Sequence, residues 1–448
     1  MTSEAYLVMA MFATFAVGLF AGFPVAFVLG GVGVLFALLA EVLPYAGIDV
    51  FAGINFIGFS ADRIFSTLTN YSLVPIAMFV FMGFMLEKSG VAERLLAAMT
   101  RSLGRTPGSL GLSIVVIGVI LAASTGIIGA SVVLLATVAL PALQRSGYNM
   151  PLGLGTVAAS GCLGILIPPS IMLIVMSDQL RLSVGDLFMA AVLPGVVLAV
   201  LYVGYIVILS MLRPSYAPPD PDAGPLDREA LIAIVRALVP PLLLMLFVLG
   251  SIFFGIASPT EASGLGALGA TLITLANGTL NWRTLIDTCT ATARTTAFLF
   301  AIMFGATCFS VVLRGYGGDD LVEGLLTGLD WSPTGILILI LATVFALGFV
   351  LDWMEIVLVV APLTVPIVVS MGFDPVWVAI LMAICLQTSF LTPPVGMALF
   401  YVKAVAPAGV TTGHIYRGVV PFVALQMLAL LLVAFFPFLA LWLPEVAY

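Results

Sequence analysis

The sequence predicts an all-α polytopic membrane protein built from two repeated halves. Of its 448 residues, 62% are hydrophobic and only 8% are charged, whereas soluble proteins carry roughly 25% charged residues. Many apolar stretches exceed the roughly 18 residues that indicate a membrane-spanning helix. Segments of alternating polarity, which a transmembrane barrel would need, are not visible. Two matching proline pairs, one in each half, indicate that the chain is duplicated.

The few basic residues orient the chain in the membrane. One connection contains Lys88, Arg94, Arg101 and Arg105, and the positive-inside rule places it in the cytoplasm. The linker over residues 213–228 is rich in proline and aspartate and is flanked by arginines, so we place it on the same side. The acidic segment "GYGGDDLVEGLLTGLDW" and the acidic C-terminal tail fit the outer side, where we also expect the N-terminus.

The first half, residues 1–212, alternates spans with one hairpin. Spans are expected near 5–22, 24–40, 73–87 and 187–212, with an amphipathic stretch near 49–70. The apolar stretch at 109–145 is too long for one helix, yet basic residues flank it on both sides. We therefore expect a re-entrant hairpin that turns at "ASTGIIGAS", where Gly126 and Gly129 permit a tight reversal. A broken helix near 150–180 follows it.

The second half, residues 229–448, repeats this plan. Spans are expected near 230–257, 261–276 and 295–313, and a stretch with Arg283 and Arg294 is expected at the inner face before the last of these. A hairpin near 334–371 should enter from the outer side and turn at "GFVLDWME". A second broken helix near 375–402 follows. The total is about ten spans plus two re-entrant hairpins.

The repeat is visible in the stretches "GILIPPSIML" and "SFLTPPVGMA". Pro168 and Pro169 match Pro393 and Pro394, which sets a fixed offset between the two halves. The same offset, without a gap, pairs three further positions: Pro141 with Pro366, Gly147 with Gly372, and Tyr148 with Phe373. The linker follows an odd number of crossings, so the two halves should have opposite orientations. Inverted repeats with discontinuous helices are typical of secondary transporters.

The proline pairs should leave main-chain oxygen atoms without helical partners. Proline has no N–H and cannot bond the carbonyl four residues earlier. The four carbonyls expected to be released are those of Gly164, Ile165, Ser389 and Phe390. An unpaired carbonyl in hydrocarbon costs roughly several kcal/mol, so it needs a partner.

A dehydrated monovalent cation is a suitable partner, because carbonyls and hydroxyls without several carboxylates fit it better than Ca²⁺. The nearby hydroxyls belong to Ser389 and Thr392 at the second break and to Ser124, Thr125 and Ser131 at the first hairpin tip. We interpret the pattern as two Na⁺ sites, one in each repeat. The alternative is that the prolines only kink packed helices.

The remaining polar residues narrow the class of function. Asp352 and Glu355 lie in an apolar hairpin, where an ionisable residue is a functional candidate. Alternatively, they reach an aqueous cavity or the outer surface, or pair with a partner subunit. The four scattered cysteines and the single histidine, His414, offer no metal cluster. No GxxxxGK loop and no serine-protease arrangement is present, and a net charge of −7 argues against nucleic acid. We therefore expect a protein that is not an enzyme.

Several motifs together resemble one family. They are "ASTGIIGASVVLL", "ASGCLGILIPPSIMLIVMSDQL", "SPTEASGLGALGA", "LGFVLDWMEI" and "FLTPPVGMA". These stretches resemble the large membrane (permease) subunit of tripartite ATP-independent periplasmic (TRAP) transporters, and the resemblance spans essentially the whole chain. The "DWMEI" variant is similar to members grouped with dicarboxylate, keto-acid or mannitol-type systems.

The resemblance implies a protein of the bacterial inner membrane with both termini in the periplasm. It implies Na⁺-coupled uptake of a small organic anion by an elevator mechanism, in which a transport domain of hairpins and broken helices slides against a scaffold. It also implies two partners, a periplasmic substrate-binding protein and a small four-helix membrane subunit. The alternative is a stand-alone, ion-coupled organic anion or citrate-type transporter that uses no binding protein.

The resemblance further assigns residues to sites. The first Na⁺ site would use Gly164, Ile167 and Pro169, with Thr125 or Ser131 from the hairpin tip. The second would use Gly348 from its own tip, with Ser389, Thr392 and Val395. Residues beside these positions are our candidates for contacting the substrate: Ser124, Ser170, Thr388, Asp352 and Glu355.

Overall fold

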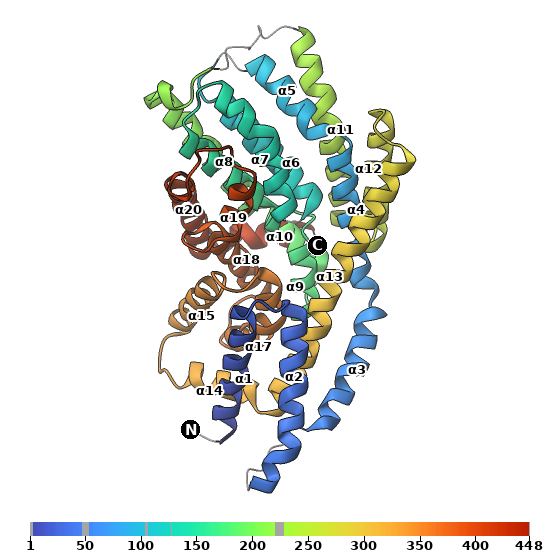
Figure 1. Ribbon diagram of the computed structural model, residues 1–448, viewed down its shortest axis with the longest axis vertical. Helices are drawn as coiled ribbons and strands as arrows, with labels where there is room; N and C mark the ends of the chain where they lie inside the picture. The colour runs from blue at the N-terminus through green and yellow to red at the C-terminus, as the bar shows by residue number, and fades with distance from the viewer. Residues whose placement is uncertain (1–2, 47–52, 104–105, 127, 220–227, 448) are drawn as a thin grey trace.

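The computed structural model describes residues 3–46, 53–103, 106–126, 128–219 and 228–447 (Figure 1). Within these ranges every regular element is a helix, as the composition predicts. Eight of the described helices are long and apolar enough to cross a membrane, and further apolar helices have 10–17 residues. The total of about ten spans plus two hairpins stays a prediction, as do the sides that the termini face.

The first half contains α1 to α10. Their bounds are α1 (Ser3–Phe20), α2 (Val25–Val42), α3 (Ile54–Leu68), α4 (Val74–Lys88), α5 (Val91–Leu103), α6 (Ser109–Thr125), α7 (Ile128–Arg145), α8 (Met150–Cys162), α9 (Ile171–Leu180) and α10 (Val184–Leu212). Short 3₁₀ turns are η1 (Leu43–Ala46), η2 (Tyr71–Leu73), η3 (Leu163–Ile165) and η4 (Pro214–Tyr216). The predicted hairpin thus contains α6 and α7, and the predicted broken helix contains α8 and α9.

The second half contains α11 to α21. Their bounds are α11 (Arg228–Phe253), α12 (Pro259–Ala276), α13 (Trp282–Gly315), α14 (Gly318–Thr327), α15 (Pro333–Leu347), α16 (Trp353–Glu355), α17 (Ala361–Ser370), α18 (Pro375–Leu391), α19 (Met397–Val405), α20 (Thr412–Phe435) and α21 (Phe438–Ala447). A π-helical turn, η5 (Ile356–Val360), joins α16 to α17. The second hairpin region contains α15 to α17, and the second broken helix contains α18 and α19.

Helix boundaries recur with the offset found in the sequence. Helix α7 covers residues 128–145, and α16 to α17 cover 353–370, so both ends are displaced by the offset that separates the proline pairs. The same displacement takes the first residue of α8, Met150, to the first residue of α18, Pro375. This agreement supports the duplication. The opposite orientation of the halves in a membrane stays a prediction.

One helix covers both the stretch with Arg283 and Arg294 and the span expected at 295–313. This helix, α13, has 34 residues, and the placement of its first part at the inner face stays a prediction. No proline interrupts this segment, so nothing in the backbone forces a break. At about 1.5 Å per residue, α13 is longer than the roughly 30 Å hydrocarbon core of a bilayer. Part of it must therefore tilt or project beyond the core.

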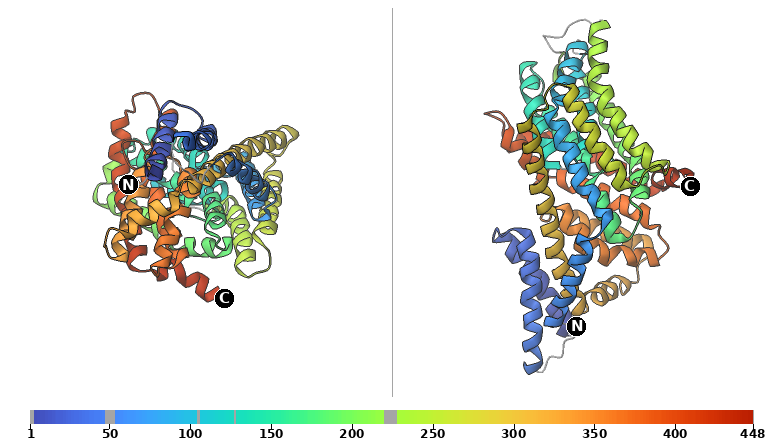
Figure 2. Two further views of the ribbon diagram at one scale, coloured as in Figure 1. Left: turned by 90° about the horizontal axis from the view of Figure 1, so that it is seen from below. Right: turned by 90° about the vertical axis from the view of Figure 1, so that its right-hand side faces the viewer.

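The helices form two groups that lie side by side (Figures 1 and 2). We call the first group the column; it contains α2 to α5 and α11 to α13, with α12 packed on α4, α11 on α5, and α2 along α13. The second, which we call the bundle, contains α6 to α10 and α15 to α20. The N-terminal end lies beside α14 at one end of the molecule, whereas the C-terminal end lies about halfway along it.

The first halves of both broken helices form the centre of the bundle. Every residue from Leu152 to Cys162 in α8 and from Trp377 to Leu391 in α18 is buried. Helix α8 is contacted by α6, α7 and α20, and these contacts need glycine. A Cβ atom on Gly155 would lie 2.0 Å from the carbonyl oxygen of Gly418 in α20. Small residues at such crossings let helix backbones approach closely within membranes.

Prediction: Gly155→Ala lowers the apparent Tm of the detergent-purified protein by about 2–5 °C, because the new methyl group must push α8 and α20 apart. Gly204→Ala in α10 is the matched control, since a Cβ atom there has nothing within 4 Å. Differential scanning fluorimetry of the two variants makes the comparison. Equal melting curves would contradict the close α8–α20 crossing.

Candidate functional site

The first helix break lies between α8 and α9. The chain passes through η3, and Ser170 is extended before α9 begins at Ile171. The Ser170 hydroxyl donates a hydrogen bond of 2.6 Å to the carbonyl of Ile165. This carbonyl has no main-chain partner among the described residues, as the proline pair predicts, and the Ser170 side chain supplies its hydrogen bond. No hydrogen bond to the carbonyl of Gly164, which is buried, is found among the described residues.

The tip of the first hairpin reaches both broken helices. Gly126 has a left-handed φ of +58°, and a Cβ atom on it would lie 3.2 Å from the backbone nitrogen of Ile171. A Cβ atom on Gly129 would lie 3.0 Å from the ring of Tyr401 in α19. Gly126 therefore makes the tight reversal of the chain, whereas Gly129 is needed because the ring of Tyr401 packs closely against it. The tip is held against the second half of each broken helix.

The predicted first-site residues are only partly brought together. Gly164, Ile167 and Pro169 lie in the same break, next to the N-terminus of α9. Ser131 is buried in α7. The side chains of Ser124 and Thr125 lie outside the described part of the structure, so their predicted roles have no geometry to support them here.

The second break lies between α18 and α19 and folds differently from the first. The Thr392 N–H donates to the carbonyl of Ser389 at 3.1 Å, so this carbonyl keeps a main-chain partner three residues later, and our expectation that it would be released is wrong. The Thr392 hydroxyl donates to the carbonyl of Thr388 at 2.7 Å. No hydrogen bond to the carbonyl of Phe390 is found among the described residues. This oxygen would lie 2.6 Å from a Cβ atom on Gly396, so glycine is required beside it.

The second hairpin tip packs directly on this break. A Cβ atom on Gly348 would lie 2.1 Å from the hydroxyl oxygen of Ser389, which no packed structure allows. The Ser389 hydroxyl itself donates to the carbonyl of Leu386 at 2.8 Å. The structure therefore brings Gly348 and Ser389, both predicted second-site residues, into contact. Thr392 lies one helical turn further on, and Val395 is 39% exposed beyond the break.

Asp352 and Glu355 have different environments at the second tip. The Asp352 carboxylate accepts the Trp353 N–H at 2.9 Å and caps the short helix α16. Glu355 is only 2% exposed, and its Oε2 has no hydrogen-bond partner among the described residues.

The two breaks differ in their access to solvent. Pro168 and Pro169 are buried, whereas Pro394 and Val395 are exposed. The carbonyl of Pro394 accepts a hydrogen bond of 2.8 Å from the hydroxyl of Tyr416 in α20. The duplicated sequence motif therefore produces two sites with unequal surroundings.

Sequence reasoning missed a buried polar cluster in the bundle. Tyr202, Gln387 and Gln426 are completely buried, and the Gln426 amide donates to the Tyr202 hydroxyl at 2.8 Å. Neither amide atom of Gln387 has a partner among the described residues. The sequence did contain an indication of this cluster, because a glutamine inside an apolar helix is rare unless it has a packing or functional role.

Sequence reasoning also missed three arginines that face one pocket. Arg63, Arg181 and Arg314 belong to three separate segments. No pattern in the sequence links residues so far apart, so only the folded arrangement could reveal this group.

Comparison with known proteins decides the class of protein. The sequence model of a family described as "Tripartite ATP-independent periplasmic transporter, DctM component" matches residues 12–439. The chain belongs to this TRAP permease family. It is therefore a multi-pass inner-membrane permease, and its relatives are transport proteins and not enzymes. Family membership implies a periplasmic binding protein and a small membrane subunit, and it favours the tripartite system over a stand-alone transporter.

Two curated relatives illustrate the range of the TRAP permease family. The C4-dicarboxylate TRAP transporter large permease protein DctM of Pseudomonas aeruginosa is 30% identical over 390 residues, which cover 86% of this chain and 89% of the relative. The isethionate TRAP transporter permease protein DctMQ of Oleidesulfovibrio alaskensis is 28% identical over 428 residues, covering 95% of this chain and 65% of the relative.

A solved structure supports the fold alone. The crystal structure of the Alcanivorax borkumensis YdaH transporter matches with a TM-score of 0.62 and covers 86% of this chain and 89% of that chain. At 14% sequence identity, this likeness concerns the arrangement of helices and carries no information on substrate or coupling ion.

Prediction: Gly348→Ala destabilises the second tip, because the added methyl group overlaps Ser389, and it lowers the apparent Tm by about 2–5 °C. Ser389→Gly in the same chain removes the overlapping side chain and should restore most of the loss. The measurement is a thermal melt of the single and double variants in detergent. If the double variant melts no higher than Gly348→Ala, the two residues are not in contact.

Proposed function

We propose that this TRAP permease couples uptake of a small organic anion to the inward movement of Na⁺, with one ion site at each helix break. The observation that carries the proposal is the contact made in both halves between a hairpin-tip glycine and a broken helix. Gly126 packs on Ile171, and Gly348 packs on Ser389. Each contact places tip backbone beside a break, where a cation can be shared by oxygens from both.

At the first site, the proposed ligands are Gly164, Ile167 and Pro169, with Thr125 or Ser131 from the tip. The carbonyl of Gly164 supports this assignment, because it is buried and has no hydrogen-bond partner among the described residues. A carbonyl in that position gains more from a cation than one that already accepts a hydrogen bond. The Ile165 carbonyl is therefore not included.

At the second site, the proposed ligands are Gly348, Ser389, Thr392 and Val395. The hydroxyls of Ser389 and Thr392 each donate to a helical carbonyl, which leaves their oxygen lone pairs free to accept a cation. The Phe390 carbonyl is a further oxygen at this break without a described partner. Such a ligand set of neutral oxygens suits Na⁺ better than a divalent ion.

The proposed substrate contacts are Ser124, Ser170, Thr388, Asp352 and Glu355. Ser170 and Thr388 now donate to the carbonyls of Ile165 and Ile384, so each hydroxyl would have to turn to donate to an anion. The carboxylates of Asp352 and Glu355 would repel an anionic group. We therefore assign them to hydrogen bonds with neutral polar groups of the substrate.

The proposed movement is an elevator-like displacement of the bundle against the column. The two groups of helices are distinct in the structure (Figure 1), and both candidate ion sites lie within the bundle. Delivery by a binding protein and bracing by a small membrane subunit complete the proposal. The named substrates of the two relatives, a C4-dicarboxylate and isethionate, support a small organic anion as cargo.

Prediction: Na⁺ raises the apparent Tm of the purified chain relative to the same concentration of K⁺, because an ion that binds only the folded state stabilises it. At ten times the dissociation constant the gain is about 1.4 kcal/mol. Thermal melts in NaCl and KCl over a range of concentrations measure it. Equal melting in both salts would contradict the ion sites.

Prediction: Thr392→Val raises the Na⁺ concentration needed for half of this stabilisation by about tenfold, as expected for loss of one oxygen ligand worth about 1.4 kcal/mol. Thr343→Val is the matched control, because its hydroxyl also donates to the carbonyl four residues earlier, at 2.8 Å, but lies in α15 outside the site. An unchanged midpoint in Thr392→Val would favour the alternative that the prolines only kink the helices.

A further inference from the structure

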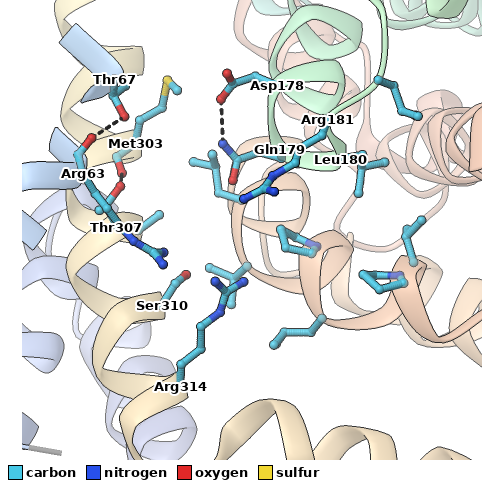
Figure 3. Close-up of a pocket in the computed structure, with 18 of the residues that line it drawn as sticks. Arg63, Thr67, Asp178, Gln179, Leu180, Arg181, Met303, Thr307, Ser310 and Arg314 are labelled. Carbon is cyan, nitrogen blue, oxygen red and sulfur yellow. Dashed lines mark hydrogen bonds between the residues drawn. The ribbon is translucent and has the colours of Figure 1, made fainter. Parts of the chain in front are cut away.

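A cavity of about 690 Å³ lies between the column and the bundle (Figure 3). One wall is made by α3 and α13 of the column, and the other by the end of α9 and by η5 and α17 of the bundle. The second wall is largely apolar; its residues include Leu358, Val359, Pro362, Leu363 and Pro366. The cavity is separate from the two helix breaks, whose prolines do not line it.

Three arginines reach this cavity from three segments. Arg63 comes from α3 and Arg314 from α13, so both belong to the column, whereas Arg181 follows α9 in the bundle. Figure 3 shows their guanidinium groups directed into the same space. The pKa of Arg63 is lowered, first by partial burial and then by the positive charges of Arg314 and Arg181. This direction agrees with the position of all three arginines in the lining of one cavity.

The carboxylates nearby do not neutralise this group. Arg314 pairs with Asp319 at 3.2 Å, but Arg63 and Arg181 have no ion pair among the described residues. Asp178 is the one carboxylate in the described lining. Its oxygens already accept hydrogen bonds from the Asn70 amide at 2.6 Å and the Gln179 amide at 3.0 Å. Three guanidinium groups against the two carboxylates of Asp178 and Asp319 leave the cavity with an excess of positive charge.

Arg181 occupies a backbone position that disfavours an arginine. It caps the C-terminus of α9 with a left-handed φ of 56°. Glycine is the usual residue at such a position, because a side chain disfavours the left-handed conformation. A strained residue whose side chain points into a charged cavity indicates a role for that side chain beyond capping.

We propose that this cavity binds a small organic carboxylate before it reaches the helix breaks. Guanidinium groups bind carboxylates through charge-assisted, often bidentate, hydrogen bonds, and the apolar wall suits the carbon skeleton of an organic anion better than an inorganic ion. This inference rests on the proposed function. Because Arg181 belongs to the bundle and the other two arginines to the column, displacement of the bundle would separate the three and release the anion.

The test is protection of the three arginines from chemical modification. The purified chain, in nanodiscs of neutral phosphatidylcholine and in Na⁺-free buffer, is treated with phenylglyoxal, with and without acetate, succinate or citrate. Peptide mass spectrometry then measures modification at each arginine. We expect at least one carboxylate to slow modification of Arg63, Arg181 and Arg314. Arg283, whose side chain is 92% exposed in α13 away from the cavity, should be unaffected.

Arg181→Gln should raise the concentration of carboxylate needed for half-protection of Arg63 and Arg314 by about tenfold, as expected for loss of one charge-assisted hydrogen bond. Arg283→Gln is the matched control and should leave the carboxylate concentration for half-protection unchanged. Equal modification of all three cavity arginines with every carboxylate would overturn the proposal. Protection by phosphatidylglycerol in the nanodisc, with none by the carboxylates, would also overturn it and assign the cavity to a lipid headgroup.

The outcome is separable from that of the ion sites. Protection in Na⁺-free buffer together with equal melting in NaCl and KCl would support the carboxylate cavity and contradict Na⁺ binding. Stabilisation by Na⁺ without protection by any carboxylate would leave the ion sites in place and overturn the cavity proposal.

Discussion

The structure depends on one constraint, the hydrogen bonds that proline cannot make inside a membrane. A doubled proline removes two consecutive donors from a helix in surroundings where water cannot replace them. The protein does this twice, at Pro168–Pro169 and Pro393–Pro394, and surrounds both breaks with buried helices, re-entrant tips and glycines that permit close approach. The packing of the bundle follows from the need to enclose these interrupted backbones.

At each break, one of the carbonyls that lost its helical hydrogen bond accepts a replacement from a nearby group. The donor is a side chain at the first break and a main-chain N–H at the second. In the first, the hydroxyl of Ser170 reaches back to the carbonyl of Ile165. In the second, the helix end tightens so that the Thr392 N–H bonds Ser389. One carbonyl at each break, that of Gly164 or Phe390, keeps no described partner. The two breaks therefore leave different oxygens available, because they differ both in the residue that follows the prolines, Ser170 or Val395, and in the backbone that precedes them.

Much of the architecture could be predicted because it depends on the covalent structure of proline and glycine and on the repeat of the sequence between the two halves. The positions of both hairpins and both breaks follow from proline, glycine and the constant offset between the two halves. The i−4 rule did not give the replacement bonds that the carbonyls of Ile165 and Ser389 accept, since it ignores 3₁₀ bonding and side-chain donors at helix ends. The charges of Arg283 and Arg294 could not show that α13 continues through them as one helix. The Arg63, Arg181 and Arg314 cavity could not be predicted, because tertiary packing alone brings these residues together.

The unequal burial of the two helix breaks affects the order in which ions could leave the two proposed sites. Pro394 and Val395 are exposed at the surface of the chain, whereas Pro168 and Pro169 are buried. Coupling ions bound at the two proposed sites would then exchange with the surroundings at different rates, and the ion at the exposed break would leave first. The two halves of the duplicated chain would therefore release their ions in a fixed order, because one helix break is buried and the other is exposed.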